Sequence, residues 1–132
     1  MKDKVAHARG WFLKAESDLS DAQRTVVSEG PFDTACFHAQ QAAEKYLKGL
    51  LAFHEEPIPK THDIEELQRL CLPFAAHSKL TEIDLTVLSD YAVPSRYDLE
   101  FWPDRETAAD AFRLAEQVRE IVLALVSRQA LP

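Results

Sequence analysis

The segment 33–53 carries a run of polar residues whose types and spacing are suited to binding an anion. Gln41, Glu44, Lys45 and Lys48 recur at intervals of three and four, which places them on one face if the segment is helical. Two amines beside an amide and a carboxylate could hold a phosphate. The same spacing also fits an exposed face on which Glu44 and Lys48 form an ordinary ion pair.

A second group of polar residues precedes the short amphipathic segment 64–70. Free backbone N–H groups at a helix start favour an anion, and His62 adds an imidazole that titrates near neutrality. Alternatively, Thr61 or Asp63 caps the helix, with Glu66 three residues after Asp63 as in a capping box, and His62 has no role. Both interpretations remain open.

Arg96 and Tyr97 form a third candidate, in a segment between Pro94 and Pro103 that has no helical period and is predicted to be an ordered loop. Arginine recognises phosphate with two parallel hydrogen bonds, and tyrosine can stack on a base or donate a hydrogen bond. The alternative is a structural Arg96 that bonds backbone carbonyls or pairs with Asp98.

Other site chemistry is not supported by the sequence. No two of the histidines have HxxxH or HExxH spacing; they are His7, His38, His54, His62 and His77. Phosphate-binding loops, GxGxxG and GxSxG motifs are also missing. We therefore expect no metal and no cofactor, and neither conventional nucleotide hydrolysis nor acyl transfer.

The net charge and the cysteines indicate which binding partners and which cellular compartment to expect. The chain has 15 Lys and Arg against 22 Asp and Glu, a net charge of −7, which disfavours general binding to duplex DNA. Cys36 and Cys71 are predicted to be reduced thiols. The N-terminus lacks the apolar stretch of a signal peptide, and the longest apolar run, residues 121–126, is too short to span a membrane. We expect a cytoplasmic protein.

Hydrophobic periodicity predicts helices that could position these residues. Apolar residues alternate at three and four over 5–26, 33–53 and 104–128, and two shorter helices are expected at 64–73 and 81–93. The sequence therefore predicts one all-α domain over residues 1–132, a mostly antiparallel up-and-down bundle of about five helices.

Particular residues are expected to bound and pack these helices. Gly30 and Pro31 should end the first helix, and Thr81 should cap the fourth. The core stripe of the second helix comprises Cys36, Ala39, Ala43, Tyr46 or Leu47, Leu50 and Phe53. It remains open whether Asp18, on the first helix, pairs with Lys45, which would make Lys45 structural.

Four motifs in this order resemble the HEPN domain, the helical domain named for higher eukaryotes and prokaryotes nucleotide-binding. They are WFLKAESDLSDAQ at 11–23, FHAQQAAEKYLKGLLAF at 37–53, THDIEELQRL at 61–70 and SRYDLEFWPD at 95–104. A closing amphipathic helix extends the resemblance to about residues 4–127. It implies a bundle of four to five helices, frequent homodimers, and a small nucleotidyltransferase partner in a toxin–antitoxin pair.

Many HEPN proteins are metal-independent RNases whose site is an Arg followed, after four to six residues, by a His. Counting from Arg96 places Phe101, Trp102 and Pro103 at those three positions, so this chain departs from the pattern. An RNase would need His62 to reach the same cleft.

Three functions follow. The first is a non-catalytic module that binds a nucleotide or RNA phosphate through the candidate residues and acts with a nucleotidyltransferase; these residues are Gln41, Lys45, Lys48, His62, Arg96 and Tyr97. The second is an RNase formed across a homodimer, with Arg96 and His62 as catalytic residues. The third is an interaction module anchored by Phe101 and Trp102.

Overall fold

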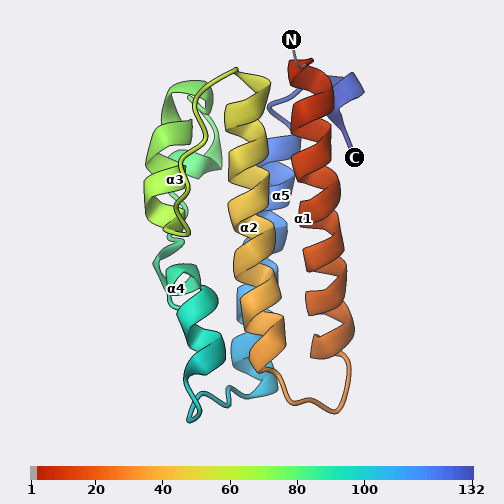
Figure 1. The fold of residues 1–132 in the computed structure, drawn as a ribbon, viewed down its shortest axis with the longest axis vertical. Coiled ribbons are helices and arrows are strands. Elements are labelled where there is room, and N and C mark those ends of the chain that lie inside the picture. The colour runs from red at the N-terminus through yellow and green to blue at the C-terminus, as the bar shows by residue number, and fades with distance from the viewer. Residues whose placement is uncertain (1–2) are drawn as a thin grey trace.

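Five α-helices and four short 3₁₀ turns make up the computed structural model, which describes residues 3–132 (Figure 1). The α-helices are α1 (Lys4–Val26), α2 (Asp33–Phe53), α3 (Ile64–Cys71), α4 (Thr86–Ser89) and α5 (Arg105–Leu123). The turns are η1 (Leu72–Phe74), η2 (Lys79–Thr81), η3 (Val93–Tyr97) and η4 (Arg128–Ala130). Among the described residues there is no strand, so the predicted all-α class is confirmed.

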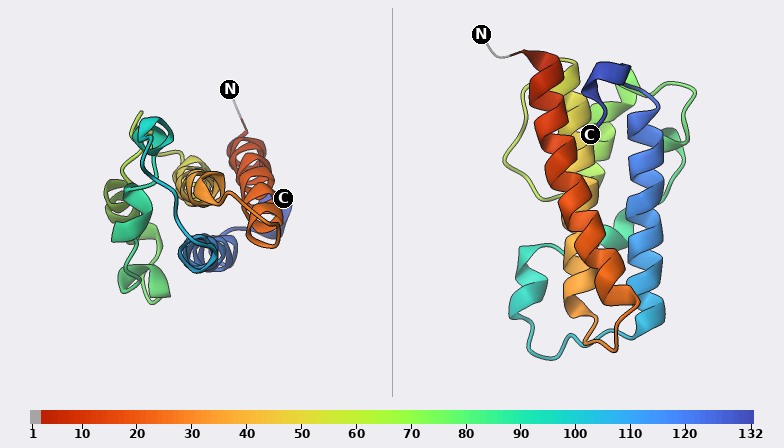
Figure 2. Two further views of the ribbon diagram at one scale, coloured as in Figure 1. Left: turned by 90° about the horizontal axis from the view of Figure 1, so that it is seen from below. Right: turned by 90° about the vertical axis from the view of Figure 1, so that its right-hand side faces the viewer.

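The three long helices lie side by side, with α3 and α4 against the other side of α2 (Figures 1 and 2). α1 runs antiparallel to both α2 and α5. α2 and α5 run in the same direction, because the segment 54–104 carries the chain from one end of the bundle back to the other (Figure 2). This returning segment holds two of the three predicted groups of site residues.

α2 is the central element, since 14 of its 21 residues are buried. α1 and α5 each bury a single stripe of alternating residues, as their periodicity predicts. Most residues of these stripes are alanines, and small side chains let helix backbones approach closely: Ala8, Phe12, Ala15, Leu19 and Ala22 in α1, and Ala108, Ala111, Ala115, Val118 and Val122 in α5. The predicted core of α2 is confirmed, except that Phe53 is only half-buried.

The predicted bounds of the first three helices agree with the structure to within a few residues, but two details of the helix ends differ. Gly30 does adopt a left-handed conformation, with φ 87°, yet α1 already ends at Val26. Gly30 therefore shapes the connection to α2 and does not cap α1.

The prediction that Thr81 caps a long fourth helix was wrong. Thr81 belongs to η2, where its hydroxyl donates to the carbonyl of Ser78, and α4 is only four residues long. The carboxylate of Asp84 accepts from the backbone N–H of Thr86 at the start of α4. Between α3 and α5 the chain forms three 3₁₀ turns and this one short helix, of which α4 and η3 contact α2.

The last helix also ends earlier than predicted, at Leu123 instead of Arg128. After a bend, η4 folds back toward α1, where the guanidinium of Arg9 donates to the carbonyls of Gln129 and Leu131. This tertiary contact takes the place of a further helical turn. Within residues 3–132, no helix is both long and apolar enough to cross a membrane.

One close approach of α1 to α2 depends on a glycine. A Cβ atom on Gly49 would lie 2.4 Å from Cε1 of Phe12, a side chain that is itself fully buried. A Cβ atom on Gly10, also inside a helix, would meet no neighbouring side chain or helix within 4 Å. The two glycines therefore form a matched pair, one required by packing and one not.

We expect Gly49→Ala to lower the free energy of unfolding by about 1–3 kcal/mol, since Phe12 must leave its site. Gly10→Ala should raise it by about 0.5–1 kcal/mol, because alanine loses less backbone entropy in a helix. Urea unfolding of both variants measures the difference. Equal stabilities would contradict the close approach of the two helices.

Candidate functional site

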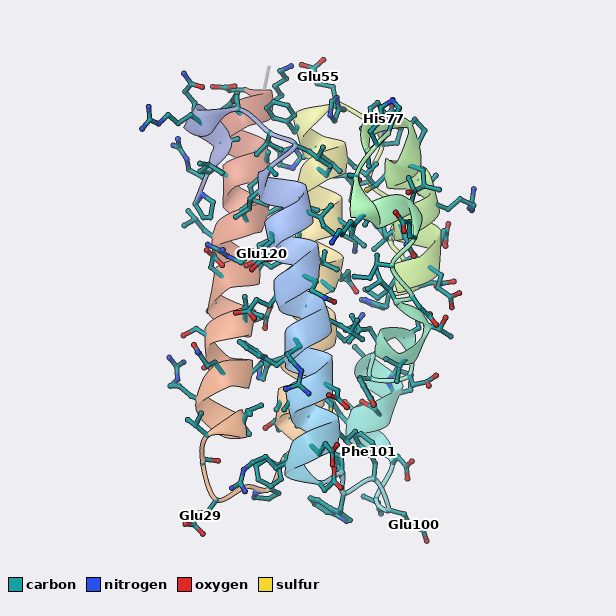
Figure 3. All side chains as sticks on the ribbon, turned by 180° about the vertical axis from the view of Figure 1, so that it is seen from behind. Glu29, Glu55, His77, Glu100, Phe101 and Glu120 are labelled. Carbon is teal, nitrogen blue, oxygen red and sulfur yellow. The ribbon has the colours of Figure 1, made fainter. Side chains whose placement is uncertain are left out.

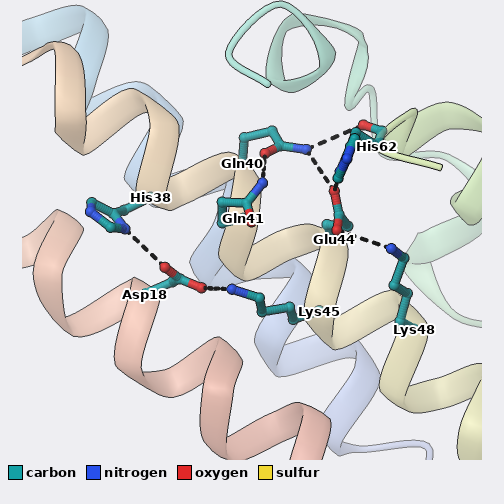
Figure 4. Close-up of polar contacts among 8 residues, drawn as sticks. All are labelled: Asp18, His38, Gln40, Gln41, Glu44, Lys45, Lys48 and His62. Carbon is teal, nitrogen blue, oxygen red and sulfur yellow. Dashed lines mark hydrogen bonds and ion pairs between the residues drawn. The ribbon is translucent and has the colours of Figure 1, made fainter. Parts of the chain in front are cut away.

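A buried carboxylate, Glu44, organises the polar face of α2 (Figure 4). Its side chain is only 5% exposed. One oxygen, Oε1, accepts from His62 Nδ1 at 2.8 Å and from Gln40 Nε2 at 3.2 Å, while Oε2 accepts from Lys48 Nζ at 3.1 Å. Three donors around one carboxylate satisfy a charge that would otherwise be costly to bury.

The predicted pair between Glu44 and Lys48 is confirmed, but it does not lie on an exposed face. Lys48 is buried, with its ammonium 5.7 Å from the centre of the Trp11 ring. The polar face of α2 is covered because α1 packs on one side of it and the returning segment on the other. Removing one partner would leave the other charge buried without compensation.

The second carboxylate of this face comes from α1 (Figure 4). Asp18 accepts a hydrogen bond from His38 Nδ1 at 2.8 Å and a further one from the amine of Lys45. Burial alone would raise the pKa of Asp18, but these hydrogen bonds and the nearby positive charge lower it below its ordinary value. The pairing left open by the sequence is therefore present, and it ties α1 to α2.

His62 is held in place through its backbone as well as its ring. Gln40 Nε2 donates to the carbonyl oxygen of His62 at 3.2 Å, and the ring bonds Glu44. The carboxylate of Asp63 accepts from the N–H groups of Glu65 and Glu66, so Asp63 caps α3. The capping interpretation is confirmed for Asp63, which uses two of the helix-start N–H groups. His62 has a partner of its own and remains half exposed.

Arg96 and Tyr97 lie in η3, so this part of the predicted loop is a 3₁₀ turn. The guanidinium carbon of Arg96 lies 4.8 Å from the centre of the Phe37 ring, a cation–π contact. Asp98 does not pair with it, and its carboxylate accepts from the N–H of Glu100. In residues 3–132 Arg96 has no ion-pair partner, and the neighbouring Tyr97 is 77% exposed.

The exposed side chains of Arg96 and His62 both contact residues of α2. Phe37, which supports Arg96, and Glu44, which holds His62, are seven residues apart and therefore on one face of α2, about 10 Å apart along its axis. Gln41 lies between them and donates to Gln40 Oε1 at 2.7 Å. The structure thus places Arg96, Gln41 and His62 along one face of α2, whereas the amines of Lys45 and Lys48 are paired with Asp18 and Glu44.

Several contributors were missed from the sequence. Asp18 was singled out, but its second partner His38 was not, and neither were Gln40 and Phe37. Arg119 of α5 also forms a bidentate ion pair with Glu16 at 2.9 and 3.0 Å. One signal in the sequence could have indicated Gln40. It is a polar residue next to Gln41 in the helix with the most apolar residues.

Metal and thiol chemistry find no support at this site. Across the described part of the chain, no three His, Cys, Asp or Glu side chains are grouped as a metal would need. Cys36 and Cys71 are free and buried, as predicted. Burial raises the pKa of Cys36 to about 11 and that of Cys71 to about 12, so both thiols stay protonated and unreactive.

Fold and site together define a helical bundle of the HEPN type. The HEPN domain profile matches residues 8–125, and the chain belongs to the HEPN family. A comparison with curated proteins gave no match.

Two crystal structures have similar folds. TT1696 from Thermus thermophilus is 28% identical with a TM-score of 0.70, and the match covers 91% of this chain and 98% of that one. ST0689, an archaeal HEPN homologue, is 26% identical with a TM-score of 0.68, and the match covers 96% of this chain and 100% of that one.

The paired carboxylate of Asp18 predicts a loss of stability in acid. Because its pKa is lower in the folded chain than its ordinary value of 3.8, its stabilisation is present above that value and is lost as the pH falls below it. Asp18→Asn should therefore reduce stability at pH 7 and flatten the decline between about pH 5 and pH 2. Urea unfolding across this range is the measurement.

Asp21→Asn is the matched control, since Asp21 also lies on α1 but pairs with Arg24 at the surface. Surface pairs contribute little, so this variant should keep both the stability and the acid dependence of the parent protein. An equal effect of the two substitutions would show that the Asp18 pair does not hold α1 to α2.

Proposed function

We propose that this HEPN domain is a non-catalytic module that binds a nucleotide, or the phosphate of an RNA, at the Arg96 end of the α2 face. Arg96 binds the phosphate and Tyr97 stacks on the base. His62 adds a second donor further along the same face. The observation that carries the proposal is the guanidinium of Arg96, supported by the Phe37 ring and exposed beside Tyr97.

The lysines have a supporting part in this proposal. The amines of Lys45 and Lys48 are already bonded to Asp18 and Glu44, so their charge is largely neutralised. Lys45 fixes Asp18, whereas Lys48 fixes Glu44 and through it His62. Gln41 completes the row between His62 and Arg96. The unpaired guanidinium of Arg96 also explains how a chain with a net charge of −7 can bind an anion locally.

The partner in this proposal is a small nucleotidyltransferase, in a toxin–antitoxin-like pair, with the HEPN chain as a homodimer. Support comes from membership of the HEPN family, since resemblance to this family implies such pairs and homodimers. The nucleotide bound at Arg96 would then be a substrate or product that the two proteins share. Cytoplasmic location remains a prediction from the reduced thiols.

A thermal-shift panel of nucleoside mono-, di- and triphosphates tests the binding site. A nucleotide at a hundred times its Kd stabilises the protein by about 2.7 kcal/mol, which raises Tm by about 10 °C at this size. Arg96→Ala should abolish the shift and leave the Tm of the free protein nearly unchanged, because Arg96 is exposed.

Arg113→Ala is the control, since Arg113 is an exposed arginine on α5 that pairs with Asp110. It should retain the full nucleotide shift. The proposal fails if no nucleotide raises Tm, or if Arg96→Ala and Arg113→Ala respond alike.

One observation favours a second candidate, a metal-independent RNase. The carboxylate of Glu44 accepts from His62 Nδ1, so a neutral imidazole carries its proton there and leaves Nε2 free to accept one. His62 would remove the proton of a ribose 2′-hydroxyl, whose oxygen forms a bond to the phosphorus as the bond to the 5′-oxygen breaks, and the 5′-oxygen would take a proton from water. Arg96, from this chain or from a second copy, would stabilise the charged phosphorane.

RNase activity predicts cleavage of single-stranded RNA in the presence of EDTA. His62→Gln should abolish cleavage, whereas His77→Asn, a change of an exposed histidine with φ 66°, should not. Intact RNA at high protein concentration would exclude this candidate and leave nucleotide binding untouched.

A further inference from the structure

The loop that follows the candidate site exposes large apolar side chains at one end of the bundle. In the segment 98–104, hereafter the acidic loop, Leu99 is 84% exposed and Trp102 is 65% exposed. Both are more exposed than Leu13, the exposed leucine of α1, at 52%. Figure 3 shows this end of the molecule, with Glu100 at its tip and Phe101 closer to the helices.

The acidic loop is held in one conformation by its own hydrogen bonds. Asp98 accepts from the N–H of Glu100 at its carboxylate and from the N–H of Phe101 at its carbonyl, both at 3.1 Å. The indole N–H of Trp102 donates to the carbonyl of Leu99, also at 3.1 Å, so the two exposed apolar residues are neighbours. A surface that is already ordered loses little entropy on binding.

Phe101 does not take part in this surface, although the sequence suggested it as an anchor for a partner. It is half-buried, and its ring stacks on Tyr91 with the centroids 5.6 Å apart. Phe101 therefore fastens the acidic loop to the bundle. Trp102 and Leu99 are the side chains that the loop presents outward.

The charged residues of the acidic loop all have one sign, and the nearest cation before the loop, Arg96, lies against the Phe37 ring. Asp98, Glu100 and Asp104 lie within the acidic loop, which contains no Lys or Arg. Arg105 follows it, but its guanidinium points to the connection between α1 and α2, where it donates to the carbonyls of Val26 and Ser28. The apolar pair thus stands inside an acidic border.

We propose that the acidic loop docks a basic amphipathic segment of another protein, with Leu99 and Trp102 against its apolar side and its Lys or Arg residues on the acidic border. Tryptophan is the side chain most enriched at binding hot spots, and charge complementarity selects the partner. A second copy of this chain fits less well, because two acidic loops brought against each other would repel.

The probe is a synthetic amphipathic peptide of Leu and Lys, with a Leu and Glu peptide of the same pattern as its counterpart. The chain has two tryptophans, so Trp11→Phe leaves Trp102 as the only indole. The Lys peptide should shift the Trp102 emission to shorter wavelength, with an affinity that falls as salt is raised. The Glu peptide should cause no shift.

Leu99→Ser should weaken binding of the Lys peptide by about tenfold without changing Tm, because Leu99 is exposed. Leu13→Ser is the matched control and should bind as the parent does. Glu100→Lys should also weaken binding, through the border charge alone. All three should keep any nucleotide shift at Arg96, which separates this surface from the candidate site.

The proposal is overturned by three outcomes. These are equal binding of the two peptides, an effect of Leu13→Ser as large as that of Leu99→Ser, and a concentration-dependent dimer that Leu99→Ser dissociates. The last would assign the acidic loop to contacts between copies of this chain.

Discussion

The burial of α2 on several sides at once constrains every polar group that this helix carries. α1, α5 and α3 pack around it, and Gly49 lets the Phe12 ring of α1 approach its backbone. A polar side chain in that position must find a partner inside the protein, because water cannot reach it. Gln40, Glu44 and Lys48 meet this requirement together in one hydrogen-bonded cluster.

This constraint decides which predicted residues can meet a ligand. The sequence of α2 suggests a phosphate site because it holds two lysines on one face. Their amines are bonded to carboxylates, so little of that positive charge is available to a ligand. The groups that remain exposed, His62 and Arg96, come from the returning segment and only rest on α2. That segment also returns the chain to the other end of the bundle, so α2 and α5 run parallel. The candidate site lies on the side of α2 that α3 and η3 contact.

The returning segment 54–104 carries two surfaces of different chemistry. Around Arg96 the protein offers a free cation beside an exposed tyrosine, and a few residues later it offers exposed apolar side chains among acids. Phe37 and Phe101 anchor these surfaces, one under the guanidinium and one against Tyr91. The family RNase pattern would need a histidine at position 101, 102 or 103; of the residues found there, Phe101 packs inward and Trp102 faces outward.

The amino-acid sequence by itself determined the helical class, the long helices α1 and α2 almost to their ends, the Asp63 cap and the HEPN family, because periodicity, capping and ordered motifs are local signals. Only the tertiary structure decided that Lys45 pairs with Asp18, that Arg96 stacks on Phe37, and that α4 is short. These outcomes join residues far apart in the chain, and the burial that makes a charge seek a partner arises only when the helices pack.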